Sequence, residues 1–142
     1  MARNEEEEIF ALEKQAARLG YTVVEFSSLA GEQDLAGQFH WIADHLAQTI
    51  RKETPAERRR LRQGMSTRIR ILSDVIREKH IQYGLLPFRC IDEHDECVRK
   101  RKRQKKSPYL CFLALYICLA NSMKVLLAAI AAAATKAGGH LS

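Results

Sequence analysis

The sequence predicts an all-α fold in which an antiparallel helical hairpin is followed by a short charged helix and a long apolar C-terminal helix. Apolar residues recur at helical spacing along most of the chain. Helix start signals stand at Asn4, Thr54 and Ser107. We therefore divide the chain of 142 residues into a soluble helical region at 1–86, a charged linker helix at 87–106 and an apolar helix at 107–136.

The first helix is predicted to begin after Asn4, because Asn4 and Glu7 have the spacing of a capping box. Acidic residues at 5–8 favour the positive end of the helix dipole. We expect Gly20 to end this helix. Residues 21–26 have strand propensity but no second strand to pair with, so we expect an extended connector there, with a strand as the alternative.

Two central helices are predicted to pack against each other as an antiparallel hairpin. The earlier one covers about residues 28–52 and the later one runs from Thr54-Pro55, a cap followed by proline, to Gly84. A turn around Pro87 and a charged helix at about 92–106 follow. The predicted core positions of the central helices are Leu35, Phe39, Ile42, Leu46, Ile50, Leu61, Met65, Ile69, Leu72, Ile76 and Tyr83.

The apolar segment at 109–135 has 27 residues, enough to cross about 30 Å of hydrocarbon at about 1.5 Å per residue. Lys124, near its middle, costs roughly 2.5–3.5 kcal/mol on insertion. A basic flank favours a membrane anchor, with the N-terminal region cytoplasmic. The alternatives are a buried core helix of a soluble bundle and a hairpin broken at 121–124.

Seven cations form this basic flank and are candidates for contact with anionic lipid or phosphate. A nuclear import signal is a further reading of the same run. The residues are Arg99, Lys100, Arg101, Lys102, Arg103, Lys105 and Lys106.

A second basic cluster lies on the helix that begins after Thr54, where Arg58, Arg62 and Arg70 are candidates for nucleic-acid contact. The chain has no aromatic platform for bases and no Asn or Gln set at a helix start for reading base edges. A solvated face, or one that pairs with the acidic N-terminal helix, is the simpler expectation.

Charge is distributed unevenly, with a net −6 over residues 1–50, +6 over 51–86 and +4 over 87–106. Such asymmetry favours either a homo-oligomer that joins unlike halves or a basic face turned toward phosphate groups.

The spacing of Cys90, His94 and Cys97 places three zinc-ligand types on one helix face. Paired knuckles with two intervening residues are absent, so three ordinary half-buried side chains are the simpler expectation. We expect no disulfide framework, with Cys111 and Cys118 acting as small hydrophobic residues. Since the N-terminus lacks a signal-peptide pattern, we expect a reducing compartment.

No catalytic constellation and no cofactor motif occur in the sequence, so we expect no enzyme activity and no cofactor. The sequence predicts a non-enzymatic helical interaction protein, tethered to a membrane by its C-terminal helix, with anionic lipid and an unidentified protein as partners. A soluble basic helical protein that binds nucleic acid or a partner protein is the first alternative. A small zinc-stabilised helical domain is the second.

Overall fold

Local capping chemistry starts two of the helices at the predicted positions. A computed structural model describes residues 4–85 and 88–139 and contains five helices in that part of the chain. Helix α1 (Glu5–Leu29) begins where Asn4 Oδ1 accepts a hydrogen bond of 2.8 Å from the Glu7 amide. Helix α3 (Pro55–Gln82) begins where Thr54 Oγ1 accepts from the Glu57 amide at 3.4 Å. The all-α prediction is confirmed.

Helix α1 runs through Gly20 and through residues 21–26, so the predicted helix end and extended connector are wrong. Gly20 is buried, and a Cβ at this position would collide with the hydroxyl of Tyr116 and with Ala43. The glycine therefore allows three helices to approach closely. Helix α1 ends at Leu29 and is capped by Ala30; Gly31 follows, with a φ of +79°, the left-handed conformation that glycine adopts without strain.

Helix α2 (Gln33–Arg51) turns back along α1, and these two form the most extensive helix pair of the fold. Helix α3 packs against α2 in turn. The predicted core faces are confirmed where the helices overlap fully: Leu35, Phe39, Ile42, Leu46, Met65, Ile69, Leu72 and Ile76 are buried. Leu61 and Ile50 are only half-buried, and Tyr83 lies exposed at the end of α3.

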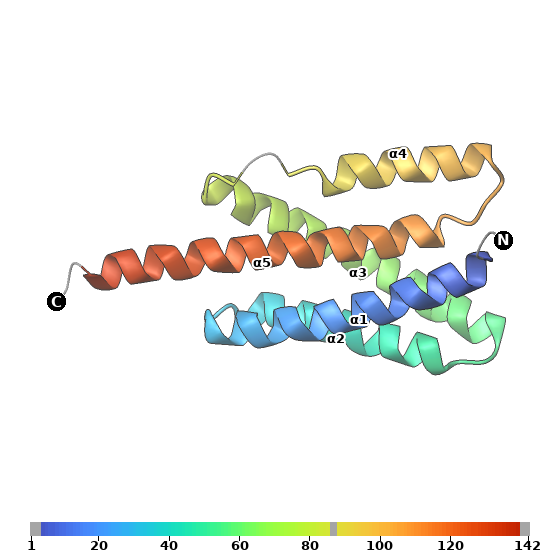
Figure 1. Ribbon diagram of the computed structural model, residues 1–142, viewed down its shortest axis with the longest axis horizontal. Helices are drawn as coiled ribbons and strands as arrows, with labels where there is room; N and C mark the ends of the chain where they lie inside the picture. Colours follow the sequence, from blue (N-terminus) through green and yellow to red (C-terminus); the bar gives the residue numbers. More distant parts are fainter. Residues whose placement is uncertain (1–3, 86–87, 140–142) are drawn as a thin grey trace.

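Helix α4 (Cys90–Arg103) lies along the first part of α5 (Tyr109–Gly139), as Figure 1 shows. Helix α5 lies between α4 and the α1–α2 pair and then projects beyond the other helices (Figure 1). Helix α4 ends at Arg103, and Lys105 in the turn that follows has a φ of +56°, which a continuing helix does not allow. The predicted end of the charged helix at residue 106 is therefore too late. Pro87, the centre of the predicted turn, lies outside the described residues.

A single hydrophobic core draws side chains from all five helices. Its largest fully buried members on α5 are Leu113, Tyr116, Leu119, Met123 and Leu126. The predicted soluble region and the predicted linker helix thus both pack against α5, which is the predicted apolar helix.

The polar residues near the middle of α5 are accommodated by the bundle, and the helix is continuous there. The carbonyl oxygen of Ser122 lies 3.0 Å from Nε2 of His80, and its hydroxyl lies 3.4 Å from Sγ of Cys90. Asn121 is exposed and Lys124 is half-buried. A hairpin broken at 121–124 is therefore not formed.

Two disulfide bonds join α4 to α5, in contrast to the absence of a disulfide framework that we expected. Cys90 pairs with Cys118 and Cys97 pairs with Cys111, with Cα–Cα distances of 6.0 and 5.8 Å. The two cysteines of α4 are seven residues apart, as are the two cysteines of α5, so each helix carries both of its cysteines on one face. Two antiparallel helices can therefore form two bridges at once. Sequence spacing alone does not reveal that the two faces meet.

Candidate anion-binding cleft

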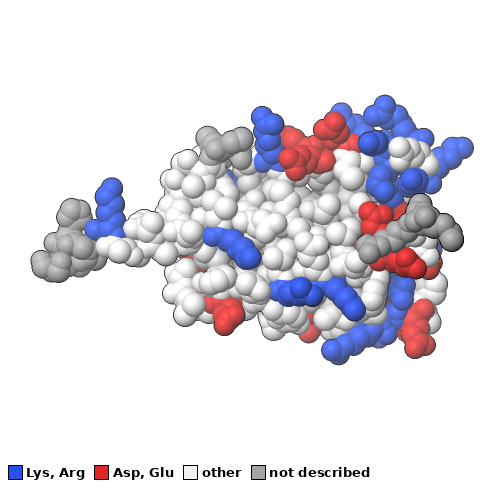
Figure 2. All heavy atoms as spheres, viewed as in Figure 1, with Lys and Arg blue, Asp and Glu red and all other residues white. Residues whose placement is uncertain are grey.

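Most of the basic run at 99–106 is exposed at the end of the molecule where α4 stops and α5 starts. Figure 2 shows Lys and Arg side chains gathered at this end, with acidic side chains beside them. We call the following residues the basic end: Arg99, Lys100, Lys102, Arg103, Lys105 and Lys106.

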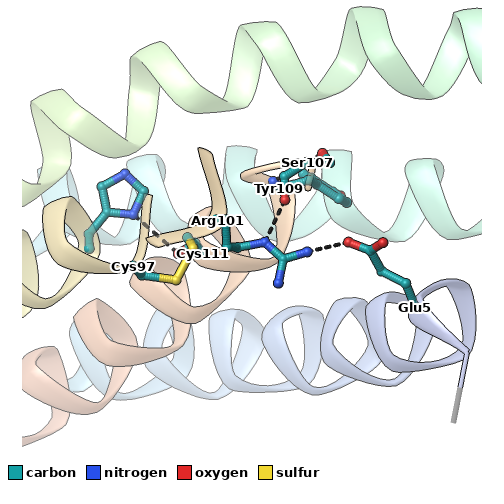
Figure 3. Close-up of a disulfide and its surroundings, with 7 residues drawn as sticks. Glu5, Cys97, Arg101, Ser107, Tyr109 and Cys111 are labelled. Atoms are coloured by element: carbon teal, nitrogen blue, oxygen red, sulfur yellow. Dashed lines mark hydrogen bonds and ion pairs between the residues drawn. A yellow bond between two sulfur atoms is a disulfide. The ribbon is translucent and has the colours of Figure 1, made fainter. Parts of the chain in front are cut away.

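Arg101 differs from the rest of the run because it is held within the fold. Its Nε donates a hydrogen bond of 2.6 Å to the carbonyl oxygen of Ser107, and its guanidinium forms an ion pair with Glu5 (Figure 3). The side chain is 13% exposed. Arg101 thus joins the α4–α5 turn, next to the Cys97–Cys111 disulfide, to the acidic start of α1.

The arginines that the sequence suggests for nucleic-acid contact have three different surroundings. Arg58 Nε donates to the carbonyl of Lys52 at 2.9 Å. The Arg62 guanidinium stacks over the Tyr109 ring, 4.6 Å from its centroid, and Arg70 is exposed. Arg58 and Arg70 are exposed and Arg62 is half-buried.

A cleft of about 510 Å³ lies between α3, α4 and the first turn of α5. It combines cations from both basic clusters of the sequence with two serine hydroxyls, an imidazole and apolar and aromatic side chains, and no carboxylate lines it. The lining residues are Arg59, Arg62, Gln63, Ser66, Arg70, His94, Val98, Lys102, Ser107, Pro108, Tyr109 and Phe112.

Tyr109 forms one wall of the cleft and is held by Glu13 of α1. Its hydroxyl donates a hydrogen bond of 2.7 Å to the buried Glu13 carboxylate. Burial raises the pKa of Glu13, while the Tyr109 hydrogen bond and the charges of Arg58 and Arg62 act to lower it. Burial and the neighbouring Glu13 charge also raise the pKa of Tyr109, which keeps the phenol protonated.

His94 lies at the cleft and is 8% exposed. Its Nδ1 is 3.2 Å from the carbonyl oxygen of Cys111, which leaves Nε2 for a ligand. Burial, with the charge of Arg70, lowers the pKa of His94. This environment favours the neutral form of the imidazole.

The three residues that the sequence suggests as zinc ligands do not act together in this structure. Cys90 and Cys97 are bonded to Cys118 and Cys111, and a disulfide sulfur is not the thiolate that zinc requires. His94 instead makes its hydrogen bond to α5. Within residues 4–85 and 88–139, no group of three or more His, Cys, Asp or Glu side chains is arranged to hold a metal ion.

A neighbouring hollow shares Arg70, Val98 and Lys102 with the cleft and contains the carboxylates of α4. Asp92, Asp95 and Glu96 line this second hollow together with Arg99. The cleft is thus the more positively charged of the two.

Sequence reasoning named Arg62, Arg70, Lys102 and His94 as candidate site residues but did not predict the cleft. Ser107 is a helix start signal in the sequence, and Tyr109 and Phe112 belong to the apolar run that follows it. Only the packing of α3 against α5, and the pairing of α4 with α5, brings these residues beside Arg62 and Lys102.

Helix α5 is long and apolar enough to cross a membrane, over Tyr109–Lys136, but 56% of its most apolar window is buried inside the bundle. A mostly buried core helix of a soluble protein can have the same length and apolar composition. Membrane anchoring therefore has only weak support from this helix.

No protein-family model, no curated protein and no solved structure matches this chain.

Proposed function

We propose that this protein is a non-enzymatic helical interaction protein that attaches to an anionic membrane through its basic end. The observation that supports this proposal most is the convergence of cations from α3 and α4 at one end of the bundle. Each Lys or Arg near an anionic membrane surface contributes about 1 kcal/mol of attraction. Six exposed cations in one run are enough for reversible attachment.

The packing of α5 favours attachment at the surface over a membrane span. Along α5, exposed residues predominate only over 128–136, and the helical backbone of residues 128–139 extends about 18 Å at the helical rise. That length is shorter than the roughly 30 Å of a hydrocarbon core. This projecting end also lies at the opposite end of the molecule from the basic end (Figure 1, Figure 2).

A second candidate is tethering by insertion of the whole of α5, as its length and apolar composition suggest. Insertion would require α5 to leave α1 and α3, and its first part to stay bonded to the basic helix α4.

The two disulfides bear on which side of the membrane the protein occupies. They support the oxidising side over the cytoplasmic side that the sequence predicts, since disulfides persist in oxidising compartments.

The experiment that separates these candidates uses the oxidised full-length protein and vesicles of phosphatidylcholine with or without phosphatidylglycerol. We expect binding only to the anionic vesicles, with release by high salt and by carbonate. Retention after carbonate treatment would support insertion of α5 instead. An absence of binding to the anionic vesicles at low salt would contradict the proposal.

Charge replacement provides a matched test of the surface involved. The triple variant Arg99→Gln, Lys100→Gln, Arg103→Gln should lose roughly 1 kcal/mol of vesicle affinity per residue. The control Arg18→Gln, Arg77→Gln, Lys136→Gln makes the same change in net charge at exposed positions outside the basic end. Equal losses in the two variants would show that binding depends on net charge alone.

Nucleic-acid binding is the competing outcome of the same charge distribution. We expect weak, sequence-indifferent binding of duplex DNA that disappears near physiological salt. Arg58 and Arg62 are held by contacts within the fold, which supports this expectation. Tight DNA binding that survives physiological salt and depends on Arg70 would instead favour the nucleic-acid alternative.

A further inference from the structure

The cleft between α3, α4 and α5 differs from the rest of the basic end because it is concave and has an apolar floor. We infer that it is a binding site for a terminal phosphate monoester, presented by a lipid headgroup at the membrane surface. This inference rests on the proposed function and adds a preference among anionic lipids.

The charges of the cleft suit a ligand with two negative charges. Arg59, Arg62, Arg70 and Lys102 line it, without a carboxylate among the lining residues. Within the described part of the chain, the two ion pairs are Lys79–Glu32 and Arg101–Glu5, so neither uses one of these four cations. A phosphate monoester carries close to two charges near neutral pH, whereas the phosphate diester of most lipids carries one.

Further polar groups line the same space. The first turn of α5 lies at one edge of the cleft, and the N-terminus of a helix carries partial positive charge. The hydroxyls of Ser66 and Ser107 line the walls. His94 adds Nε2, which becomes a donor when an anion favours the protonated ring. These groups can bind several oxygens of one phosphate.

The volume and the apolar surface of the cleft suit a ligand larger than a free phosphate ion. A volume of about 510 Å³ is in the range of small-molecule sites and is much larger than one phosphate group. Val98, Tyr109 and Phe112 give it apolar surface. A phosphate joined to a glycerol backbone and the start of its acyl chains fits this combination of charged and apolar walls.

The test compares vesicles that contain phosphatidic acid, a phosphate monoester, with phosphatidylglycerol vesicles adjusted to the same surface potential. We expect about tenfold tighter binding to phosphatidic acid, a factor that corresponds to roughly one net charge-assisted hydrogen bond. The double variant Arg70→Gln, Lys102→Gln should lose this preference. The control Arg18→Gln, Arg77→Gln changes net charge equally at exposed positions outside both the cleft and the basic end, and should keep it.

Each outcome separates this inference from the proposed function. Equal binding of wild-type protein to the two kinds of vesicle would overturn the inference and leave the proposed function in place. A preference that the Arg70/Lys102 variant retains would also overturn it, because another surface would then be responsible. Binding of soluble glycerol 3-phosphate without any vesicle binding would overturn the proposed membrane attachment and the lipid headgroup as the ligand. It would show instead that the cleft binds a soluble phosphate monoester.

Discussion

The two parts of α5 have similar apolar character but opposite surroundings. Residues 109–127 alternate between buried positions and a narrow exposed stripe that includes Asn121 and Val125. Residues 128–136 are exposed or half-buried and consist mainly of alanine. A membrane span needs apolar residues on all sides, whereas a core helix needs them only toward its neighbours. The periodicity of large and polar residues in the first part therefore indicates core packing, which hydropathy averaged over the helix conceals.

The first part of α5 is also the only part of this helix that is covalently joined to a neighbour within the described residues. Both disulfides connect it to α4. Alanines at 131–134 lie beyond these bridges, where their small side chains bury little area. Stability should consequently depend on the first part far more than on the second.

Removing the disulfides should produce the largest loss of stability. The bridges close loops with sequence separations of 14 and 28 residues. The chain-entropy model gives about 3–4 kcal/mol for each such loop. Urea unfolding with and without a thiol reductant measures the effect, with a variant in which all four cysteines are serine as the control that reductant should not change. Equal urea midpoints for oxidised and reduced wild-type protein would contradict the two disulfide bonds between α4 and α5.

Truncating one side chain on each side of α5 tests the core assignment directly. Leu119 is fully buried and Val125 is 54% exposed. Leu119→Ala should cost about 2–5 kcal/mol of unfolding free energy because it leaves a cavity. Val125→Ala should change it by no more than about 0.5 kcal/mol. If chemical denaturation gives comparable losses at both positions, the buried face of α5 has been assigned incorrectly.

Two glycines within helices should respond to the same substitution with opposite signs. Gly20→Ala introduces a methyl group against Tyr116 and Ala43 and should cost about 1–3 kcal/mol. Gly37 on α2 has no neighbouring atom within 4 Å of the added Cβ. Gly37→Ala should therefore stabilise the protein by up to about 1 kcal/mol through helix propensity. Thermal unfolding of the two variants provides the comparison, and stabilisation by Gly20→Ala would show that α1 does not approach α5 closely.

The smallest effect concerns Glu13, whose pKa is raised in the folded protein by burial. The folded state then binds a proton that the unfolded state has released, so stability falls as the pH rises from the ordinary carboxyl value through the raised one. Glu13→Gln removes this dependence while keeping an oxygen that accepts from Tyr109. Wild-type protein should lose stability relative to the variant as the pH rises through this window. A relative gain in denaturation measurements as the pH rises above the ordinary carboxyl value of about 4 would contradict the raised pKa.

The starts of α1 and α3 were predictable from the sequence because they depend on neighbouring residues, whereas α2, which lacks a side-chain cap, starts at Gln33 and not near residue 28 as predicted. Asn4 with Glu7 and Thr54 with Glu57 form their hydrogen bonds within one turn, and no distant residue is needed. The core faces of α2 and α3 follow from the period of the helix in the same way. The sequence by itself therefore determined the helical class, most of the boundaries and the positions of the cations.

Tertiary structure decided what the sequence left ambiguous. A glycine signals a helix end or a close contact, and only the approach of Tyr116 makes Gly20 the latter. The cysteines of α4 and α5 have the same spacing whether they bind metal, stay free or pair, and the packing of the two helices selects the disulfides. The cleft likewise arises where Arg62, Lys102 and Tyr109 meet from three helices. These features depend on contacts between residues distant in the chain, which local patterns do not specify.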